Sequence, residues 1–235
     1  MSNSLLSYRK FIPALFTLMV IIVLAVNAQN QKPKKYIVNG YVGGYRGLVK
    51  VEEIDADKLN EAINKYKIGS VLNVSSHTLS LQEWKSLLPT IHKSYLKGNS
   101  TIPILYGIDA IHGMNYTIGG TLFPQEIGLA ATWNRSFAKR FGEITAYEMK
   151  ASGIPWNFSP VLDVARQPLW SRYFETLGED PFLAMSMGKE LINGYQGTGA
   201  IDEYHGAACL KHFVGYSQPL SGRDRTPAWI PEKYM

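Results

Sequence analysis

The sequence predicts an α/β protein, and three observations support this prediction. Short apolar or β-branched segments alternate along the chain with longer amphipathic segments. Polar residues that could take part in binding or catalysis directly follow several of the predicted strands. The Gly-rich loops of nucleotide-binding folds are missing, because neither Gly43-Gly44 nor Gly119-Gly120 has the required spacing. A doubly wound sheet and a (β/α)8 barrel both fit the alternation, and the second and third observations favour the barrel.

Helices are expected where apolar residues recur every three or four positions. These segments span residues 55–67, 80–96, 124–153 and 178–195. Ser80, with Glu83 three residues later, forms a capping-box pattern at the start of the second segment. We expect the third segment to break into two helices near Asn134, and a further helix to start near residues 230–232.

Strands are expected in the short apolar runs between these helices. They span residues 71–74, 102–108, 155–164 and 207–214. Polar residues follow or end the last three strands: Asp109 and His112, Asp163 and Arg166, and Lys211 and His212. A barrel enzyme builds its site from side chains at the C-terminal ends of several strands, so this placement favours a TIM-like (β/α) barrel.

Composition excludes several other classes of protein. The 235 residues are 46% hydrophobic, which is typical of a globular chain and not of a disordered or collagen-like one. A single cysteine excludes an intrachain disulfide and a CxxC-type zinc site. After residue 28 the chain has 22 basic and 19 acidic residues. So small an excess, with no basic run interleaved with aromatic residues, argues against nucleic-acid binding.

Residues 1–28 have the pattern of a secretory signal peptide. Arg9 and Lys10 precede an apolar run of 16 residues, and Val26-Asn27-Ala28 is a small-x-small cleavage site. A full membrane span needs about 20 apolar residues. We therefore expect a secreted, extracellular or periplasmic protein without stable membrane insertion, with an uncleaved membrane anchor as the alternative.

The mature chain is expected to have one short entry segment and one folded domain. Residues 29–54 form a basic, proline-containing N-terminal segment, and residues 55–235 form the domain. Asn-x-Ser/Thr triplets mark glycosylation in a eukaryotic secreted protein where they are exposed. The triplet at Asn99, in a predicted turn, is the best candidate.

Three groups of residues could carry chemistry, and each has a structural alternative. Asp109 could accept hydrogen bonds from two neighbouring sugar hydroxyls, or it could cap a turn. Arg172 offers a rigid fork of donors, and Trp170 beside it could form a flat wall for a sugar ring or belong to the core. Lys211 and His212 would face opposite sides of a regular strand, so both reach one pocket only if the backbone is distorted there.

Seven segments in order resemble glycoside hydrolase family 3, the family of β-glucosidases and related exo-acting enzymes. They are Tyr106–Gly113, Thr121–Gln125, Asn157–Val164, Trp170–Arg172, Glu175–Pro181, Lys211–Tyr216 and Gly222–Pro227. The resemblance covers about residues 55–235. It implies a TIM-like N-terminal barrel domain that binds the non-reducing terminal sugar, without a metal or other cofactor.

The resemblance also implies roles for single residues. Those that match the family's sugar-binding positions are Asp109, Arg172, Lys211 and His212, with Asp224 and Arg225 as weaker candidates. Asp163 and Glu175 match family motifs as scaffold residues. The family is known for cis non-prolyl backbone near the Lys-His motif, which would let both side chains reach one pocket. The sequence departs from a common family pattern at Gln167, Leu169 and Ser171.

The catalytic residues of the family have no counterpart here. Its nucleophile is an aspartate in a Ser-Asp-Trp-like motif well beyond the Lys-His motif, and its acid/base is usually a glutamate in a second domain. Neither occurs in this sequence, and only about half of the eight strands of a barrel can be identified. We therefore expect an incomplete barrel, from a longer polypeptide or a truncated gene, that is inactive alone.

Two functions are compatible with these expectations. The first is the N-terminal part of a secreted retaining β-glucosidase that hydrolyses terminal non-reducing β-D-glucosyl residues in carbohydrate catabolism. Its partner would be a β-glucoside or oligosaccharide. The second is a non-catalytic or vestigial carbohydrate-binding fragment that lacks the nucleophile. The catalytic His-Asp loop of the family's hexosaminidase branch is not present, which favours glucosides over N-acetylglucosaminides.

Overall fold

A computed structural model describes residues 56–73, 78–98, 102–200 and 202–234. The predicted signal peptide, the predicted entry segment over residues 29–54 and the triplet at Asn99 lie outside the described residues. The chain divides into two compact units, one of Met1–His77 with Thr90–Ile104 and the other of Thr78–Pro89 with Leu105–Met235. Every predicted site residue belongs to the second unit.

The first unit contains the early helix and strand that the sequence predicts. Helix α2 (Ala56–Asn60) continues into one π-helical turn, η1 (Glu61–Lys65), and β1 (Ser70–Leu72) follows. β1 ends before Asn73 because that residue has a φ of 51°, which is outside the strand region.

Helix α3 (Leu81–Leu96) contributes residues to both units. The predicted capping box begins it. The Ser80 backbone N–H donates to Glu83 Oε2 at 2.7 Å, and the Glu83 N–H donates to Ser80 Oγ at 3.2 Å.

The second unit contains a small parallel sheet. Strand β2 (Leu105–Ile108) pairs in parallel with β3 (Trp156–Asn157), with Ile108 opposite Asn157. Two isolated parallel bridges, Trp156–Ala207 and Val161–Lys211, bring the next segment alongside β3. The sheet and its helices agree with the α/β prediction, whereas the closed barrel stays a prediction.

Two of the strand predictions were too long. The strand expected over residues 155–164 is regular only at Trp156–Asn157, because Pro160 has no N–H to donate to a ladder. The strand expected over 207–214 is reduced to the two bridges. There the His212 N–H donates to the side chain of Asp163 at 2.9 Å instead of to a neighbouring strand.

The helices of the second unit match the predictions closely. The segment expected to break near Asn134 forms α4 (Glu126–Ala130) and α5 (Arg135–Ala151). Asn134 caps α5, since its side chain accepts hydrogen bonds from the N–H groups of Ser136 and Phe137. Asp180 caps α6 (Pro181–Gln196), since its side chain accepts a hydrogen bond from the Phe182 N–H. The short helices η2 (Tyr173–Glu175) and η3 (Glu232–Tyr234) are of the 3-10 type.

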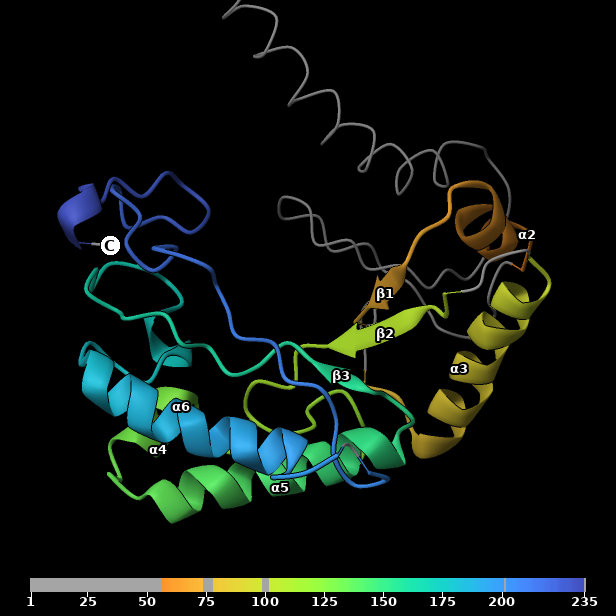
Figure 1. Cartoon of the computed structure of the whole chain (residues 1–235), viewed down its shortest axis with the longest axis horizontal. Helices are drawn as coiled ribbons and strands as arrows, with labels where there is room; N and C mark the ends of the chain where they lie inside the picture. The colour runs from red at the N-terminus through yellow and green to blue at the C-terminus, as the bar shows by residue number, and fades with distance from the viewer. Residues whose placement is uncertain (1–55, 74–77, 99–101, 201, 235) are drawn as a thin grey trace, which may run out of the picture. The chain divides into compact units, whose positions relative to one another are not determined.

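The main apolar core of this unit lies between α5 and α6, which run alongside each other (Figure 1). Glycines allow this close approach. A Cβ on Gly142 of α5 would lie 2.9 Å from the Cα of Gly194 of α6 and 2.5 Å from the Leu191 carbonyl oxygen. Leu177, Met187 and Tyr195 fill the core beside this contact.

Candidate functional site

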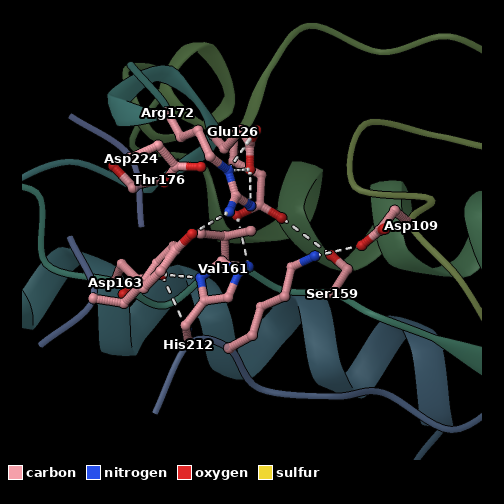
Figure 2. A network of polar contacts seen from close by, with 12 residues as sticks. Asp109, Glu126, Ser159, Val161, Asp163, Arg172, Thr176, His212 and Asp224 are labelled. Atoms are coloured by element: carbon pink, nitrogen blue, oxygen red, sulfur yellow. Dashed lines mark hydrogen bonds and ion pairs between the residues drawn. The ribbon is translucent and has the colours of Figure 1, made fainter. Parts of the chain in front are cut away.

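The structure brings all six predicted site residues into one cluster in the second unit. Four of them form what we call the clamp: Asp109 pairs with Lys211, His212 follows Lys211 in the chain, and Tyr216 contacts both His212 and Arg172. Figure 2 shows Asp109, His212 and Arg172 in this cluster. Asp224 hydrogen-bonds the same tyrosine, and Arg225 Nε lies 3.5 Å from Asp224 Oδ2. Three segments far apart in the sequence therefore deliver acidic and basic groups to one place.

Asp109 and Lys211 form an ion pair at the ends of β2 and of the bridge at residue 211. Lys211 Nζ lies 2.5 Å from Asp109 Oδ1. The backbone beside Asp109 is held by Asn157, a fully buried residue of β3. Asn157 Oδ1 accepts a hydrogen bond from the Ala110 N–H, and Asn157 Nδ2 donates to the Ala110 carbonyl, both at 3.1 Å. The position of Asp109 is thus fixed by a side chain of the neighbouring strand.

His212 is held by Asp163. The Asp163 carboxylate accepts from the His212 backbone N–H at 2.9 Å and lies 2.7 Å from its Nδ1. The Asp163 side chain is 1% exposed, while that of His212 is 26% exposed. The Lys211–His212 and Phe213–Val214 peptide bonds are cis, which confirms the distorted backbone that the resemblance implied. Both adjacent side chains contact carboxylates of the same cluster.

Arg172 is held by Glu175 and Tyr216. Its Nε and Nη2 donate to the Glu175 carboxylate, with a shortest distance of 2.6 Å, and its Nη1 lies 3.5 Å from the Tyr216 hydroxyl. Burial opposes the charge of the guanidinium, but the hydrogen bonds and charge of Glu175 outweigh burial and raise the pKa of Arg172. Arg172 is therefore a fixed cation with one edge turned toward Tyr216.

Of the two roles that the sequence left open for Trp170, the structure supports the core residue and not the sugar-facing wall. It is 2% exposed, and its indole N–H donates to Asp224 Oδ1 at 3.0 Å. Burial opposes ionisation of Asp224. The donors Trp170 and Tyr216, together with nearby arginines, outweigh that effect and lower the pKa of Asp224. Asp224 thus ties the loop that carries Arg225 to the clamp.

Tyr216 is the centre of the cluster, although no feature of its local sequence singled it out. Its ring lies 4.4 Å from the His212 ring and 5.7 Å from the Trp170 ring, and the Arg172 guanidinium lies 5.6 Å from its ring centre. Burial is the main cause that raises the pKa of Tyr216, so its hydroxyl stays protonated at neutral pH. Only its place five residues after Lys211 in the recognised motif could have indicated it.

Two other polar residues that follow predicted strands have no place in the cluster. His112 Nδ1 contacts the Phe123 carbonyl oxygen at 3.2 Å, and Arg166 is exposed. At the positions that depart from the family pattern, Gln167 Nε2 donates to the Pro219 carbonyl at 3.3 Å, and Leu169 is 76% exposed.

The cluster is suited to bind a polyhydroxylated ligand. It combines carboxylate acceptors with ammonium, guanidinium and imidazole groups in fixed positions, which can pair with neighbouring hydroxyls. Among the described residues, no group of three or more His, Cys, Asp or Glu could hold a metal ion. In that same part of the chain, no helix has the length and apolar character to cross a membrane.

The second unit thus has parallel α/β architecture, with a cluster of acidic and basic side chains at the strand ends. A family model described as the glycosyl hydrolase family 3 N terminal domain matches residues 45–235. The chain therefore belongs to glycosyl hydrolase family 3, as the sequence motifs predicted.

The relatives in this family are glycosidases. The chain is 44% identical over 184 residues to a lysosomal beta glucosidase of Dictyostelium discoideum, covering 72% of this chain and 22% of that protein. It is 28% identical over 192 residues to a periplasmic beta-glucosidase of Salmonella typhimurium, covering 81% of this chain and 23% of that protein. Other relatives are beta-xylosidases.

A solved structure is similar as well. The exo-1,3/1,4-beta-glucanase ExoP of a Pseudoalteromonas species matches with a TM-score of 0.67 and 35% identity, over 74% of this chain and 23% of that chain. The chain thus spans less than a quarter of the length of each of these three proteins.

Proposed function

We propose that this chain binds the non-reducing terminal β-D-glucosyl residue of β-glucosides, as the sugar-binding part of a retaining family 3 β-glucosidase. The observation that carries the proposal is the contact of Asp109 with Lys211 beside His212 and Arg172. The names of the relatives, beta glucosidase and exo-1,3/1,4-beta-glucanase, support a glucoside over a xyloside.

The clamp would recognise a sugar through its hydroxyl groups. A carboxylate such as Asp109 accepts two hydrogen bonds, and Lys211 and Arg172 only donate, so neighbouring hydroxyls can satisfy both kinds of group. The partners Asp163 and Glu175 hold His212 and Arg172 in place before the sugar arrives. Such preorganisation lowers the entropy lost on binding.

Cleavage of the bond would need carboxyl groups other than those of the clamp. A retaining glycosidase uses one carboxylate as nucleophile and one carboxylic acid as general acid. Here Asp109 is paired with Lys211, Asp163 with His212 and Glu175 with Arg172. We propose that the complete hydrolase supplies the nucleophile and the acid/base from outside this cluster, and that no cofactor takes part.

Secretion is part of the proposal. The N-terminal signal pattern supports it, and so does the relative named as periplasmic. Mass spectrometry of the exported protein should find a mature N-terminus at Gln29. An N-terminus that still contains residues 11–26 would instead support the membrane anchor.

Titration calorimetry of the chain with sugars tests the binding proposal. Glucose should bind more tightly than xylose, which lacks the hydroxymethyl group, and galactose, in which the O4 hydroxyl is inverted. Asp109→Ala should weaken glucose binding at least about tenfold, because it removes the acceptor and leaves Lys211 unpaired. Glu190→Gln breaks the Arg135–Glu190 ion pair of α5 and α6 and is the matched control, with unchanged affinity. Equal affinity for all three sugars, or an unaffected Asp109→Ala variant, would contradict the proposal.

A rate assay separates binding from catalysis. The chain alone should bind glucose and leave an aryl β-glucoside uncleaved, because its clamp carboxylates are engaged. Turnover at enzymatic rates would contradict the assignment of the catalytic groups to other parts of the hydrolase. Glucose binding by a complete hydrolase that also cleaves nothing would favour the non-catalytic alternative.

A further inference from the structure

Glu126 is a fully buried carboxyl group next to the clamp that the proposed function does not use. It is the first residue of α4 and is 0% exposed. Its Oε1 accepts from Ser159 Oγ at 3.1 Å and its Oε2 from the Val161 N–H at 3.2 Å (Figure 2). Ser159 Oγ also lies 3.0 Å from the hydroxyl of Tyr195 in α6. Glu126 therefore links α4 to the segment that follows β3, and Ser159 links the same segment to α6.

That segment carries the backbone of the clamp. The Cys209 N–H donates to the Ser159 carbonyl at 3.0 Å, and the Lys211 N–H donates to the Pro160 carbonyl at 3.3 Å. On the other side, the Leu162 N–H donates to the Lys211 carbonyl at 2.8 Å. The N–H and the carbonyl of Lys211 are thus both bound by the neighbours of Val161 in the chain. Val161 itself donates its N–H to Glu126.

The same segment leads to the partner of His212. Asp163 lies two residues after Val161 and accepts from both the backbone and the ring of His212. A shift of the backbone at residues 159–161 would therefore displace Lys211 and His212 together. Asp109 and Arg172 are held by other contacts, through Asn157 and Glu175.

Burying a carboxyl group costs free energy, because the group loses its hydration. Burial raises the pKa of Glu126 well above its ordinary value, against the opposing effects of Ser159, the Val161 N–H and the charge of Lys211. The charge of Glu175 adds to the rise. Two of the groups that shift the pKa of Glu126 thus belong to the site: Lys211 is a clamp residue, and Glu175 binds the clamp residue Arg172.

We propose that Glu126 is a positioning residue for sugar binding: it fixes the Ser159–Val161 backbone and thereby sets the places of Lys211 and His212. The inference rests on the proposed function for its effect on sugars, but the effect on the backbone can be measured without any sugar.

Variants of Glu126 test the inference by hydrogen exchange, read by mass spectrometry, and by glucose titration. Glu126→Leu removes both acceptors and should speed exchange at least about tenfold in peptides covering residues 159–163 and 207–212. It should also weaken glucose binding at least about tenfold. Glu126→Gln should stay within about threefold of the wild type, because its oxygen can accept from the Val161 N–H while its amide donates to Ser159.

Glu148 provides the matched control. It accepts two hydrogen bonds from Thr121, from the N–H at 2.8 Å and from Oγ1 at 2.6 Å, and it touches no clamp residue in these contacts. Glu148→Leu should speed exchange around residue 121 and leave glucose affinity unchanged.

If circular dichroism shows that Glu126→Leu does not fold, Ser159→Ala replaces it, because it removes one of the two donors to Glu126. That variant should speed exchange in the same two peptides about threefold. Unchanged exchange there in a folded Glu126→Leu or Ser159→Ala variant would overturn the inference. If the wild type binds no glucose, the proposed function fails, and the exchange data alone decide whether Glu126 positions the backbone.

Discussion

At the scale of single residues, the cluster consists of charged side chains that are each held by a fixed partner. Asp163 is almost fully buried against His212, and Glu175 binds Arg172 through two nitrogens. Breaking a partly buried pair by removing one member leaves the other without compensation, which is more costly than losing an exposed ion pair. Substitutions in the clamp should therefore affect binding far more than similar substitutions on the surface.

Arg172→Lys tests this claim at one residue. Lysine keeps the charge but cannot contact Glu175 through two nitrogens and reach Tyr216 at the same time. We expect glucose affinity to fall at least about tenfold in titration calorimetry. Arg135→Lys, in the exposed ion pair with Glu190, is the control and should have no effect. An Arg172→Lys variant that binds as tightly as the wild type would show that sugar binding does not need the guanidinium geometry.

At the scale of elements, two chain segments near the site are fixed by side chains of the neighbouring segment. Asn157 of β3 hydrogen-bonds both the N–H and the carbonyl of Ala110 after β2. Asp163, which follows β3, holds the next segment by accepting a hydrogen bond from the His212 N–H. These bonds replace the regular ladder where the strands are short.

Asn157→Ala should therefore destabilise the protein. It leaves the Ala110 N–H and carbonyl without their side-chain partner in a buried place, which costs roughly 2–4 kcal/mol of the free energy of unfolding. Urea denaturation measures this loss. Asn193→Ala on α6 removes a single, longer side-chain contact to Glu190 at 3.4 Å and should cost less than about 0.5 kcal/mol. Equal losses in the two variants would contradict the role given to Asn157.

Sequence reasoning succeeded for the elements whose signals are local. The capping box at Ser80 and the break between two helices near Asn134 form as predicted, and the structure adds that Asn134 caps the second of these helices. It failed where tertiary contacts replace the ladder, as at His212, whose N–H bonds a side chain 49 residues away in sequence. The sequence left Trp170 open between a sugar-facing wall and a core residue, and its burial and its long-range bond to Asp224 decide for the core.

In the site too, residues within sequence motifs could be predicted, whereas a residue outside them was not. The clamp residues could be found because they belong to motifs, but Glu126 was missed. A signal for it exists: Glu126 shares the buried face of α4 with Leu129 and Ala130, at spacings of three and four residues. An acidic residue on an otherwise apolar helix face indicates a buried carboxyl group.

At the scale of the whole molecule, Glu126 should make stability depend on pH. Its pKa is raised by burial, with Lys211, Glu175 and Tyr195 among the ionisable groups around it. Between its ordinary pKa of 4.5 and the raised value, the unfolded chain has lost this proton while the folded chain keeps it. The contribution of this group to the free energy of unfolding therefore falls as pH rises through that window.

Urea denaturation of the wild type and Glu126→Gln at pH 4.5 and pH 7.5 measures this effect. The wild type should lose stability relative to the variant as pH rises. Glu190→Gln gives the opposite sign, because Arg135 lowers the pKa of Glu190 and the wild type therefore loses its advantage as pH falls. A difference between wild type and Glu126→Gln that does not change with pH would contradict a raised pKa.

A crystal structure of the chain with glucose tests the central claim most directly, because it shows which side chains the sugar hydroxyls contact. We expect one glucose whose hydroxyls hydrogen-bond Asp109 and Arg172 at the same time, with Lys211 and His212 within hydrogen-bonding distance. A glucose bound elsewhere on the molecule, or one that contacts none of these four side chains, would contradict the assignment of the clamp as the sugar site.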